Sequence, residues 1–339
     1  MRLARVADCI YDYLFLRRIL VAALAMVGGI TQASAATISI STPAELNKAL
    51  ASANPGDIIK LSPGTYSGSF VISRKGSRIE PIRLNGPKTA ILQNPDQGRG
   101  YALYLDGAEY WVLDGFTVSN SKKGIMLDNA SNNVLQNLEV HHIGAEGIHF
   151  RSFSTHNTLH GSFIHDTGTA EPGFGEGVYI GSAHSNWGKY SAGQPDKSDF
   201  NSVISNRIGP NVRAEGIDIK EGSSGGTIKN NHLDGSGISG QNYADSVIDV
   251  KGNGYQIIEN KVVYKSTEGS AFLSDGFQVH QVIPNWGNNN TFISNTFDLN
   301  TNGYGINVQK RTSDNKVCKS NSVINTSGGV TNISVTTDC

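Results

Sequence analysis

The sequence is poor in several features that would each indicate a particular class of protein. Only 17% of its 339 residues are charged and only three are methionine. A helical bundle or coiled coil would be far richer in Ala, Glu, Lys and Leu. A formal net charge of −1 leaves no basic excess for binding nucleic acid. Three cysteines are too few for a disulfide framework or a four-cysteine zinc site. What remains is a β-rich chain with 39 glycines.

The first 35 residues have the pattern of a secretory signal peptide. Arg17 and Arg18 precede an apolar run over 19–27, and Ala33-Ser34-Ala35 forms an A-x-A cleavage pattern. The run is short for a bilayer span, so a membrane anchor is the weaker alternative. We expect cleavage after Ala35, which would leave one domain over 36–339. That domain would be secreted or periplasmic and no longer attached to the membrane.

The cysteines agree with export. Cleavage after Ala35 would remove Cys9 and leave Cys318 and Cys339 in the mature chain. Disulfides form in oxidising compartments outside the cytosol. We therefore expect Cys318 and Cys339 to pair, which would stabilise the C-terminal end by about 3 kcal/mol because the closed loop is short.

From residue 100 onward a short phrase recurs, in which a Gly or small residue is followed by alternating apolar and variable positions. Each phrase has the period of a strand but is too short to bury a core alone. Such self-similarity is typical of a solenoid whose coils pack on their neighbours. A second phrase, an apolar pair followed by Asn, predicts turns. The sequence therefore predicts an all-β, right-handed parallel β-helix, since the hairpin turns of a β-sandwich are missing. The phrases start at Gly124, Gly147, Gly177, Gly216, Val247, Gly276 and Gly305.

Residues 42–53 are expected to cap the N-terminal end of the solenoid. Thr42-Pro43-Ala44-Glu45 combines an N-cap residue, a first-turn proline and a glutamate at the third helical position. A short apolar helix follows, through Leu46 and Leu50. The phrase over 55–66, PGDIIKLSPGTY, resembles the first coil of many secreted pectate-lyase-like β-helix proteins.

Outward-facing positions of successive phrases should form columns on one sheet, because coils stack about 4.8 Å apart. Asp218 would stack on Asp249 and Lys220 on Lys251, an arrangement that is destabilising in itself. A solvated checkerboard of ion pairs is one explanation, and a binding groove is the other. The loops that border this face are long and carry aromatic residues, which would either stack on sugars or pack within the loops. The first column contains His149, Tyr179, Asp218, Asp249 and Gln278, and the second contains Arg151, Lys220, Lys251 and His280. The loops are 167–175, 183–200, 234–246 and 283–289, with Trp187, Tyr190, Tyr243 and Trp286.

A basic column beside a tyrosine and several acids suits an acidic polysaccharide. Elimination from a uronate needs a cation for its carboxylate, a base for the C5 proton and an acid for the leaving O4. We expect Lys220 and Tyr179 to be the acid/base pair. Lys220 is the candidate base, because Lys251 on the next coil should favour the neutral form of one lysine. The expected substrate-binding residues are Arg151, His149, Lys251, Asp218, Asp249, Gln278, His280 and Trp187.

The chemistry needs no cofactor. A Ca²⁺ ion held by Asp218, Asp249 and Asp275 stays open as an option. We expect a monomer whose partner is the polysaccharide alone.

Four phrases resemble a known family: GEGVYIGS at 175–182, EGIDIKEG at 215–222, DVKGNG at 249–254 and DGFQVH at 275–280. They are similar to single-domain β-helix polysaccharide lyases, in particular the alginate lyases of polysaccharide lyase family 31, over most of 40–330. The resemblance implies that Tyr179 and Lys220 are the catalytic pair and that Lys251 binds the substrate carboxylate. The Gly-His-Gly and Arg-Ile-Lys motifs of polygalacturonases are absent, as is the Trp-Ile-Asp-His motif of other pectate lyases.

The leading hypothesis is a secreted lyase that cuts alginate by β-elimination. The alternatives are a pectate or glucuronan lyase, and a glycoside hydrolase that uses Asp218, Asp249 and Asp275. A non-catalytic carbohydrate-binding protein and a C5-epimerase are further alternatives.

Overall fold

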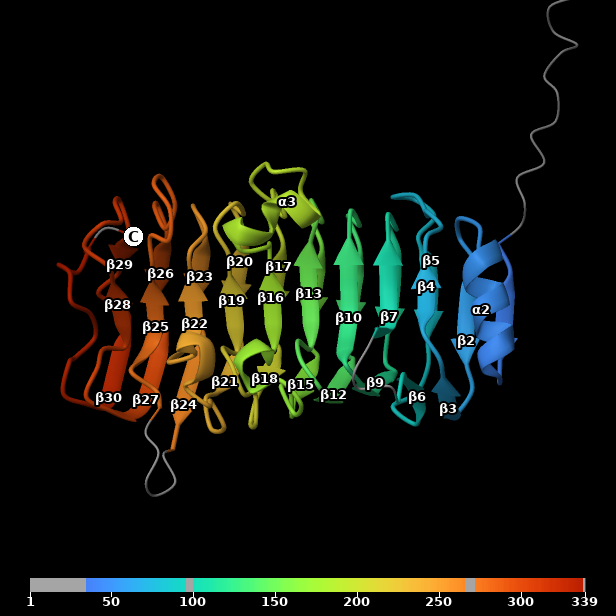
Figure 1. Ribbon diagram of the computed structural model, residues 1–339, viewed down its shortest axis with the longest axis horizontal. Helices are drawn as coiled ribbons and strands as arrows, with labels where there is room; N and C mark the ends of the chain where they lie inside the picture. The colour runs from blue at the N-terminus through green and yellow to red at the C-terminus, as the bar shows by residue number, and fades with distance from the viewer. Residues whose placement is uncertain (1–34, 96–99, 266–271, 338) are drawn as a thin grey trace, which may run out of the picture. The chain divides into compact units, whose positions relative to one another are not determined.

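The recurring phrases form strands that pair in parallel from coil to coil. The computed structural model describes residues 35–95, 100–265, 272–337 and 339. Each complete coil contributes one strand to each of three parallel sheets, which we call sheets 1, 2 and 3 in the order the chain visits them (Figure 1). This is the predicted all-β parallel solenoid.

The three sheets extend over nearly the whole described chain. Sheet 1 contains β1 (Thr37–Ile40), β2 (Ile58–Leu61), β5 (Ile82–Asn85), β8 (Trp111–Asp114), β11 (Val134–Gln136), β14 (Thr158–His160), β17 (Ser202–Ile204), β20 (Thr227–Lys229), β23 (Gln256–Ile258), β26 (Thr291–Ile293) and β29 (Lys316–Val317). Sheet 2 contains β3 (Gly64–Ser67), β6 (Ala90–Gln93), β9 (Thr117–Ser121), β12 (Glu139–Ile143), β15 (Phe163–His165), β18 (Arg207–Ile208), β21 (His232–Asp234), β24 (Lys261–Tyr264), β27 (Thr296–Thr301) and β30 (Ser322–Thr326). Sheet 3 contains β4 (Phe70–Ile72), β7 (Tyr101–Asp106), β10 (Lys123–Asp128), β13 (Ile148–Arg151), β16 (Val178–Ile180), β19 (Ile217–Ile219), β22 (Ser246–Val250), β25 (Asp275–Val279) and β28 (Ile306–Val308).

The core is a stack of aliphatic and aromatic residues inside the coils. Alternate residues of each strand point inward, so that Ile148, Val178, Ile217 and Ile248 occupy one continuous register and are fully buried. Each coil buries its apolar residues against the coils before and after it. The packing therefore fixes the register of sheet 3, on which the polar columns depend.

Buried asparagines connect the coils at one corner of the solenoid. The side-chain nitrogen of each asparagine donates to Oδ1 of the next, at distances of 2.9–3.1 Å. This ladder contains Asn206, Asn231, Asn260, Asn295 and Asn321. Asn206, Asn260 and Asn295 are asparagines of the predicted turn phrases, whereas Asn230 of the same pattern directly precedes Asn231 and has a left-handed backbone with φ 54°. These hydrogen bonds satisfy polar groups that would otherwise be buried without partners.

Helix α2 (Pro43–Ser52) covers the N-terminal end of the core, as predicted. The hydroxyl of Thr42 accepts a hydrogen bond from Glu45 N, and the Glu45 carboxylate accepts one from Thr42 N. The capping box is therefore complete. Leu46 and Leu50 on its inner face are buried.

At the other end of the chain Cys318 and Cys339 form a disulfide across 21 residues. The predicted signal peptide over 1–35 falls almost entirely outside the described residues. No helix in the described part of the chain is long and apolar enough to cross a membrane.

Candidate active site

The register of sheet 3 assembles the predicted columns. His149 pairs with Tyr179, Tyr179 with Asp218, Asp218 with Asp249, and Asp249 with Gln278. Lys220, Lys251 and His280 follow directly after β19, β22 and β25. Each backbone N–H of these three residues donates to the preceding coil, so the second column continues the ladder.

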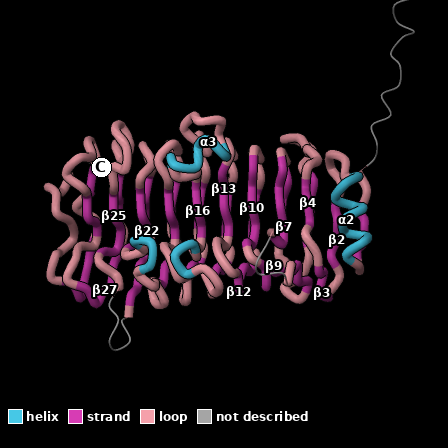
Figure 2. The backbone as a smooth tube through the Cα atoms, in the orientation of Figure 1, coloured by secondary structure: helices cyan, strands magenta, loops and turns pink. Residues whose placement is uncertain are grey.

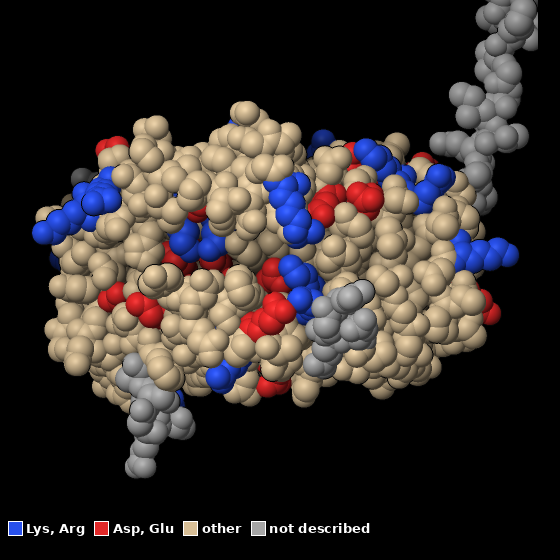
Figure 3. All heavy atoms as spheres, in the orientation of Figure 1, with Lys and Arg blue, Asp and Glu red and all other residues tan. Residues whose placement is uncertain are grey.

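A cleft of about 450 Å³ opens over β19, β22 and β25. Its floor includes Asp218, Lys220, Asp249 and Lys251, and its rim includes Asn242, Tyr243, Asp245 and Val282. Short helical turns border both edges of sheet 3 (Figure 2): η1 (Pro172–Phe174) and η3 (Gln241–Tyr243) on one side, η2 (His184–Asn186) and α3 (Trp187–Tyr190) on the other. Figure 3 shows a hollow in this face, with basic side chains at its floor and acidic ones beside them.

Asp218 lies at the centre of the charged floor. Lys220 Nζ is 2.5 Å from its Oδ2, and Lys251 Nζ is 2.9 Å from its Oδ1. Lys251 also contacts Asp249 at 2.6 Å, and Asp249 accepts a hydrogen bond from His280 Nδ1 at 3.0 Å. Each lysine of the second column therefore contacts at least one aspartate of the first, so that each charge contacts an opposite charge.

This arrangement corrects the expected protonation of Lys220. Burial lowers the pKa of Lys220, but the Asp218 carboxylate, followed by Glu176 and Glu215, outweighs burial and raises the pKa above its usual value. Burial also lowers the pKa of Lys251, and Asp218 and Asp249 likewise raise it. Lys251 therefore does not produce a neutral Lys220, since both lysines share Asp218. The ion pair with Asp218 therefore favours the ammonium form of Lys220.

Tyr179 lies against both His149 and Lys220. Its ring stacks on His149 with centroids 4.1 Å apart, and Lys220 Nζ is 5.1 Å from its centroid. Burial, Asp218 and Glu176 raise the pKa of Tyr179 well above 10. His149 is 3% exposed and its Nε2 donates to the Gly181 carbonyl, so the imidazole is a platform beneath Tyr179 and does not line the cleft. Burial lowers the pKa of His149.

Glu176 and Glu215, which the sequence analysis did not single out, also line the cleft. Glu176 is buried, and among the described residues its Oε2 has no hydrogen-bond partner. Burial, with Glu146 and Asp218 nearby, raises the pKa of Glu176 to about 8, and burial and Asp218 raise that of Glu215. Each glutamate directly precedes the glycine that opens a repeat phrase, so the repeated Glu-Gly pair was the available signal.

Glu176, Glu215 and Asp218 form a compact group of carboxylates in the described part of the chain, whereas the optional set from the sequence was Asp218, Asp249 and Asp275. Carboxylate oxygens of this compact group lie within 4.8 Å of one another, a grouping that could hold a cation. Oxygen donors suit Ca²⁺. Asp275 is engaged elsewhere, because it accepts hydrogen bonds from Gln278 Nε2, Asn307 Nδ2 and Tyr304 N.

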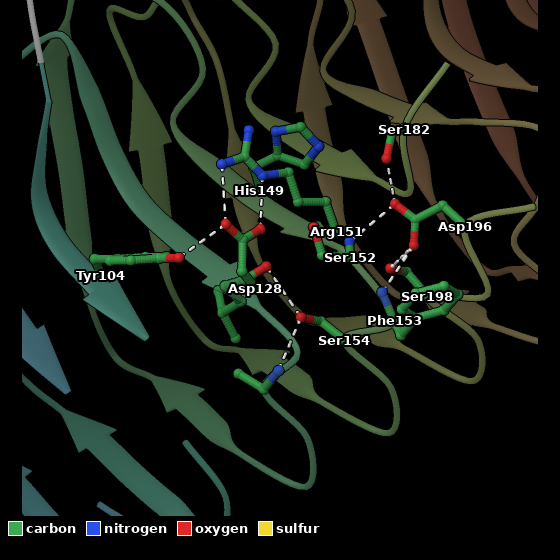
Figure 4. Close-up of polar contacts among 12 residues, drawn as sticks. Tyr104, Asp128, His149, Arg151, Ser152, Phe153, Ser154, Ser182, Asp196 and Ser198 are labelled. Atoms are coloured by element: carbon green, nitrogen blue, oxygen red, sulfur yellow. Dashed lines mark hydrogen bonds and ion pairs between the residues drawn. The ribbon is translucent and has the colours of Figure 1, made fainter. Parts of the chain in front are cut away.

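Arg151 is largely occupied by its own neighbours (Figure 4). Its Nε and Nη2 donate to the two oxygens of Asp128 at 2.6 and 3.0 Å, and the Tyr104 hydroxyl donates to the same carboxylate. The Tyr190 ring covers its guanidinium at 4.1 Å. Arg151 is 5% exposed, and the structure therefore places it beside the cleft as a packed ion pair.

Asp196 anchors the loop that carries Tyr190 and Trp187. This fully buried carboxylate accepts hydrogen bonds from the backbone N–H groups of Ser152 and Phe153 and from the hydroxyls of Ser182 and Ser198 (Figure 4). Trp187 donates from Nε1 to the Ser182 carbonyl. Its ring lies against Gly222 of the next coil and does not line the cleft.

Comparisons with known proteins agree with this geometry. Residues 29–188 match the profile of the family described as "Pel9A-like, right handed beta helix region". The crystal structure of an alginate lyase from Paenibacillus sp. str. FPU-7 is similar, with 38% sequence identity and a TM-score of 0.82, over 89% of this chain and 99% of that one. Pectate lyase Pel9A shares the fold, with 19% identity and a TM-score of 0.63, over 88% of this chain and 80% of that one.

A curated relative has the same kind of activity in its name. Pectate lyase L of Dickeya chrysanthemi is 25% identical over 328 residues, which cover 87% of this chain and 69% of the relative. The identity to the Paenibacillus enzyme, over almost all of that enzyme, is the strongest of these likenesses. The chain is therefore a polysaccharide lyase and belongs to the right-handed β-helix family that includes the Paenibacillus alginate lyase.

Proposed function

We propose that the protein cleaves alginate by β-elimination in the cleft above Lys220. The observation that carries this proposal is the pair of ammonium groups, Lys220 and Lys251, held by one carboxylate at the floor of an open cleft. A polyuronate presents a carboxylate on every sugar, and two fixed cations beside a phenol meet the needs of its elimination. The likeness to an alginate lyase favours alginate over pectate.

The structure supports a division of roles between Lys220 and Tyr179. Lys220 holds its proton, so it is available to protonate O4 as the bond to C4 breaks. Loss of that proton would break the ion pair with Asp218. The Tyr179 hydroxyl makes no hydrogen bond to any described residue, so its deprotonation breaks no contact. We assign Tyr179 as the base for the C5 proton and Lys220 as the acid, the reverse of the primary assignment made from the sequence.

We assign binding of the uronate carboxylate to Lys251 and His280. Lys251 contacts Asp218 and Asp249, which fix its position, and His280 is hydrogen-bonded to Asp249. Burial lowers the pKa of His280, but Asp249 outweighs burial and raises it. These two groups, with Gln278 nearby, would orient the substrate in the cleft. His149 and Arg151 would act indirectly, by supporting Tyr179 and the N-terminal end of the groove.

We propose that the reaction needs no metal ion, because Lys220 and Lys251 already supply the positive charge. Both oxygens of Asp218 contact a lysine, which leaves this ligand less available to a cation. If Ca²⁺ does bind, Glu176, Glu215 and Asp218 would hold it, and it would help to neutralise the uronate carboxylate.

The experiment is an assay of the full chain on polymannuronate, polyguluronate, polygalacturonate and glucuronan. Absorbance of the unsaturated uronate product should rise on alginate. Lys220→Ala and Tyr179→Phe should each lower this rate by about 10²- to 10⁴-fold. Lys229→Ala, which removes an exposed lysine paired with Glu259 on sheet 1, is the matched control and should leave it unchanged. Full activity in both the Lys220 and the Tyr179 variant would remove these residues from the mechanism.

One observation favours a second candidate, glycoside hydrolysis. Glu176 is a buried carboxyl group in the cleft with a pKa raised to about 8, as a general acid requires. The aspartates first considered for this reaction are engaged by lysines or amides. New reducing ends without the unsaturated chromophore would establish hydrolysis, and binding without cleavage would establish a binding protein. A changed C5 configuration at constant chain length would indicate an epimerase.

We also propose that residues 1–35 are removed on export and that 36–339 act as one catalytic domain and as a monomer. The Cys318–Cys339 disulfide supports an oxidising compartment. N-terminal sequencing of the protein recovered outside the cytoplasm, and light scattering of that protein, test both statements. A retained N-terminus or a stable dimer would contradict them.

A further inference from the structure

The ring of Tyr243 projects from the rim of the cleft. It is 90% exposed, more than any other large hydrophobic side chain in the described part of the protein. Exposure of one apolar residue is common and assigns no role. The location of Tyr243 is more informative, because it lines the same cleft as Lys220 and Lys251.

The backbone that carries this ring is strained and held on both sides. Asn242 and Tyr243 have left-handed backbones, with φ 54° and 65°. Such conformations cost non-glycine residues free energy and persist where the surroundings enforce them, often at binding sites. Asn242 Nδ2 donates to the Gly173 carbonyl at 2.9 Å, and Ala244, which follows Tyr243, is fully buried. The ring is therefore presented outward from a fixed support.

The surroundings of Tyr243 match the two sides of a sugar ring. The cleft floor is charged, with Lys251 and Asp249, whereas the rim presents two apolar surfaces, Tyr243 and the half-exposed Val282, beside the polar Asn242 and Asp245. A pyranose has a polar edge of hydroxyl and carboxylate groups and an apolar face of C–H groups. An aromatic ring can cover the apolar face with little loss of conformational entropy while the floor binds the polar edge.

We propose that Tyr243 forms a stacking subsite for the sugar unit next to the one cleaved above Lys220. The subsite contributes to affinity for the polysaccharide, and Tyr243 does not touch the reacting atoms. The identity of the sugar, a uronate, and the position of the cleaved bond above Lys220 rest on the proposed function, whereas the contact of Tyr243 with a bound sugar does not.

Kinetics of three variants on polymeric alginate test the subsite. Tyr243→Ala should raise KM about tenfold and leave kcat within about twofold, an effect comparable to aromatic stacking on other ring ligands. Tyr243→Phe keeps the ring and should match the parent protein. Ile79→Ala is the matched control, because Ile79 is 86% exposed and lies in an N-terminal coil, many coils before the one that carries Tyr243. An unchanged KM in Tyr243→Ala would overturn the proposal. A Tyr243→Phe defect equal to that of Tyr243→Ala would also overturn it, because the hydroxyl would then be responsible.

A binding measurement separates this proposal from the proposed function. Calorimetry with alginate tetra- and hexasaccharides in a Lys220→Ala background removes cleavage from the readout. Adding Tyr243→Ala should weaken binding about tenfold for the hexasaccharide, with unchanged circular dichroism. If the parent protein cleaves no uronate yet the second substitution still weakens binding, the proposed reaction fails and the subsite stands. If cleavage is normal and binding is unaffected, the subsite fails alone.

Discussion

The ammonium nitrogen of Lys220 lies 2.5 Å from Oδ2 of Asp218. The other oxygen of the same carboxylate contacts Lys251 from the next coil at 2.9 Å. One buried aspartate therefore holds two cations that would repel each other at this spacing. The contacts with Asp218 therefore favour the charged form of both lysines, and they outweigh the repulsion between the two ammonium groups.

Replacing Asp218 by Asn should destabilise the fold. Two buried ammonium groups would lose their shared counter-charge, which typically costs about 3–5 kcal/mol. Urea unfolding at pH 7 measures the change in the free energy of unfolding. Asp106→Asn removes an exposed carboxylate at the end of β7 and is the control. A loss no larger than that of the control would show that Asp218 does not carry this role.

The rate of elimination should increase with pH. The base form of Tyr179 is scarce at neutral pH, because burial and Asp218 raise its pKa well above 10. Each pH unit between 7 and 9 should therefore raise kcat/KM by about tenfold, since the base form grows in that proportion. Initial rates of chromophore formation across this range provide the measurement, with circular dichroism to confirm an intact fold. A flat or falling profile would argue against Tyr179 as the base.

The Asp128–Arg151 pair should contribute stability that acid removes. Burial raises the pKa of Asp128, but the hydrogen bond and charge of Arg151 outweigh burial and lower the pKa below its ordinary value. The stabilisation by this ion pair is then fully present above the pKa of Asp in the unfolded chain, about 3.9. It is lost as the pH falls through the lower pKa that Asp128 has in the folded protein. Asp128→Asn should lower Tm at pH 7 and have a smaller effect near pH 3. An equal effect at both values would contradict this linkage.

Gly177→Ala should disturb the site through the backbone. A Cβ atom there would lie 2.7 Å from the Gly216 carbonyl oxygen of the next coil. The coils carrying Tyr179 and Asp218 would have to move apart, at a cost of about 1–3 kcal/mol for overpacking. Gly188→Ala in α3, where a Cβ would meet nothing within 4 Å, is the control. Tm and lyase activity should both fall in Gly177→Ala and stay unchanged in Gly188→Ala. An unchanged Tm in Gly177→Ala would show that a Cβ atom fits between these coils.

Removal of metal ions should leave the activity unchanged. Assays after dialysis against EDTA, with and without added Ca²⁺, provide the test. Loss of activity on chelation, with recovery in Ca²⁺, would instead assign a cation to Glu176, Glu215 and Asp218. Glu176→Gln should then weaken Ca²⁺ binding measured by calorimetry.

The repeat pattern of the sequence was sufficient to predict the coils, the capping helix and the register that aligns Tyr179, Asp218 and Asp249. A parallel solenoid translates period and phase directly into neighbours, so these predictions needed no long-range information. The prediction of a neutral Lys220 was wrong because the alignment showed only which residues share a column. It did not show that the Lys220 side chain reaches Asp218. Glu176 and Glu215 were missed because each precedes the glycine at which the phrase was taken to begin.

The burial of Arg151 and His149 could not have been predicted from the columns alone. Both occupy outward positions of sheet 3, yet the loop over 183–200 covers this part of the sheet and places Tyr190 on Arg151. The length of that loop indicated a border of the groove. The anchoring of its end by Asp196 depends on backbone N–H groups, which no side-chain pattern reveals.

The asparagine ladder makes the scaffold independent of the lengths of the segments between its coils. Asn206 and Asn231 are 25 residues apart, and Asn260 and Asn295 are 35 apart, yet the amide contacts are the same. Loops at the cleft rim can therefore vary in length and sequence while the stacked coils that carry them stay the same. Exchanging only the exposed tip over 241–243 between homologous lyases should transfer preference for substrate length, while the buried Ile238 and Ala244 on either side keep the interior unchanged. This tip is therefore a practical starting point for engineering.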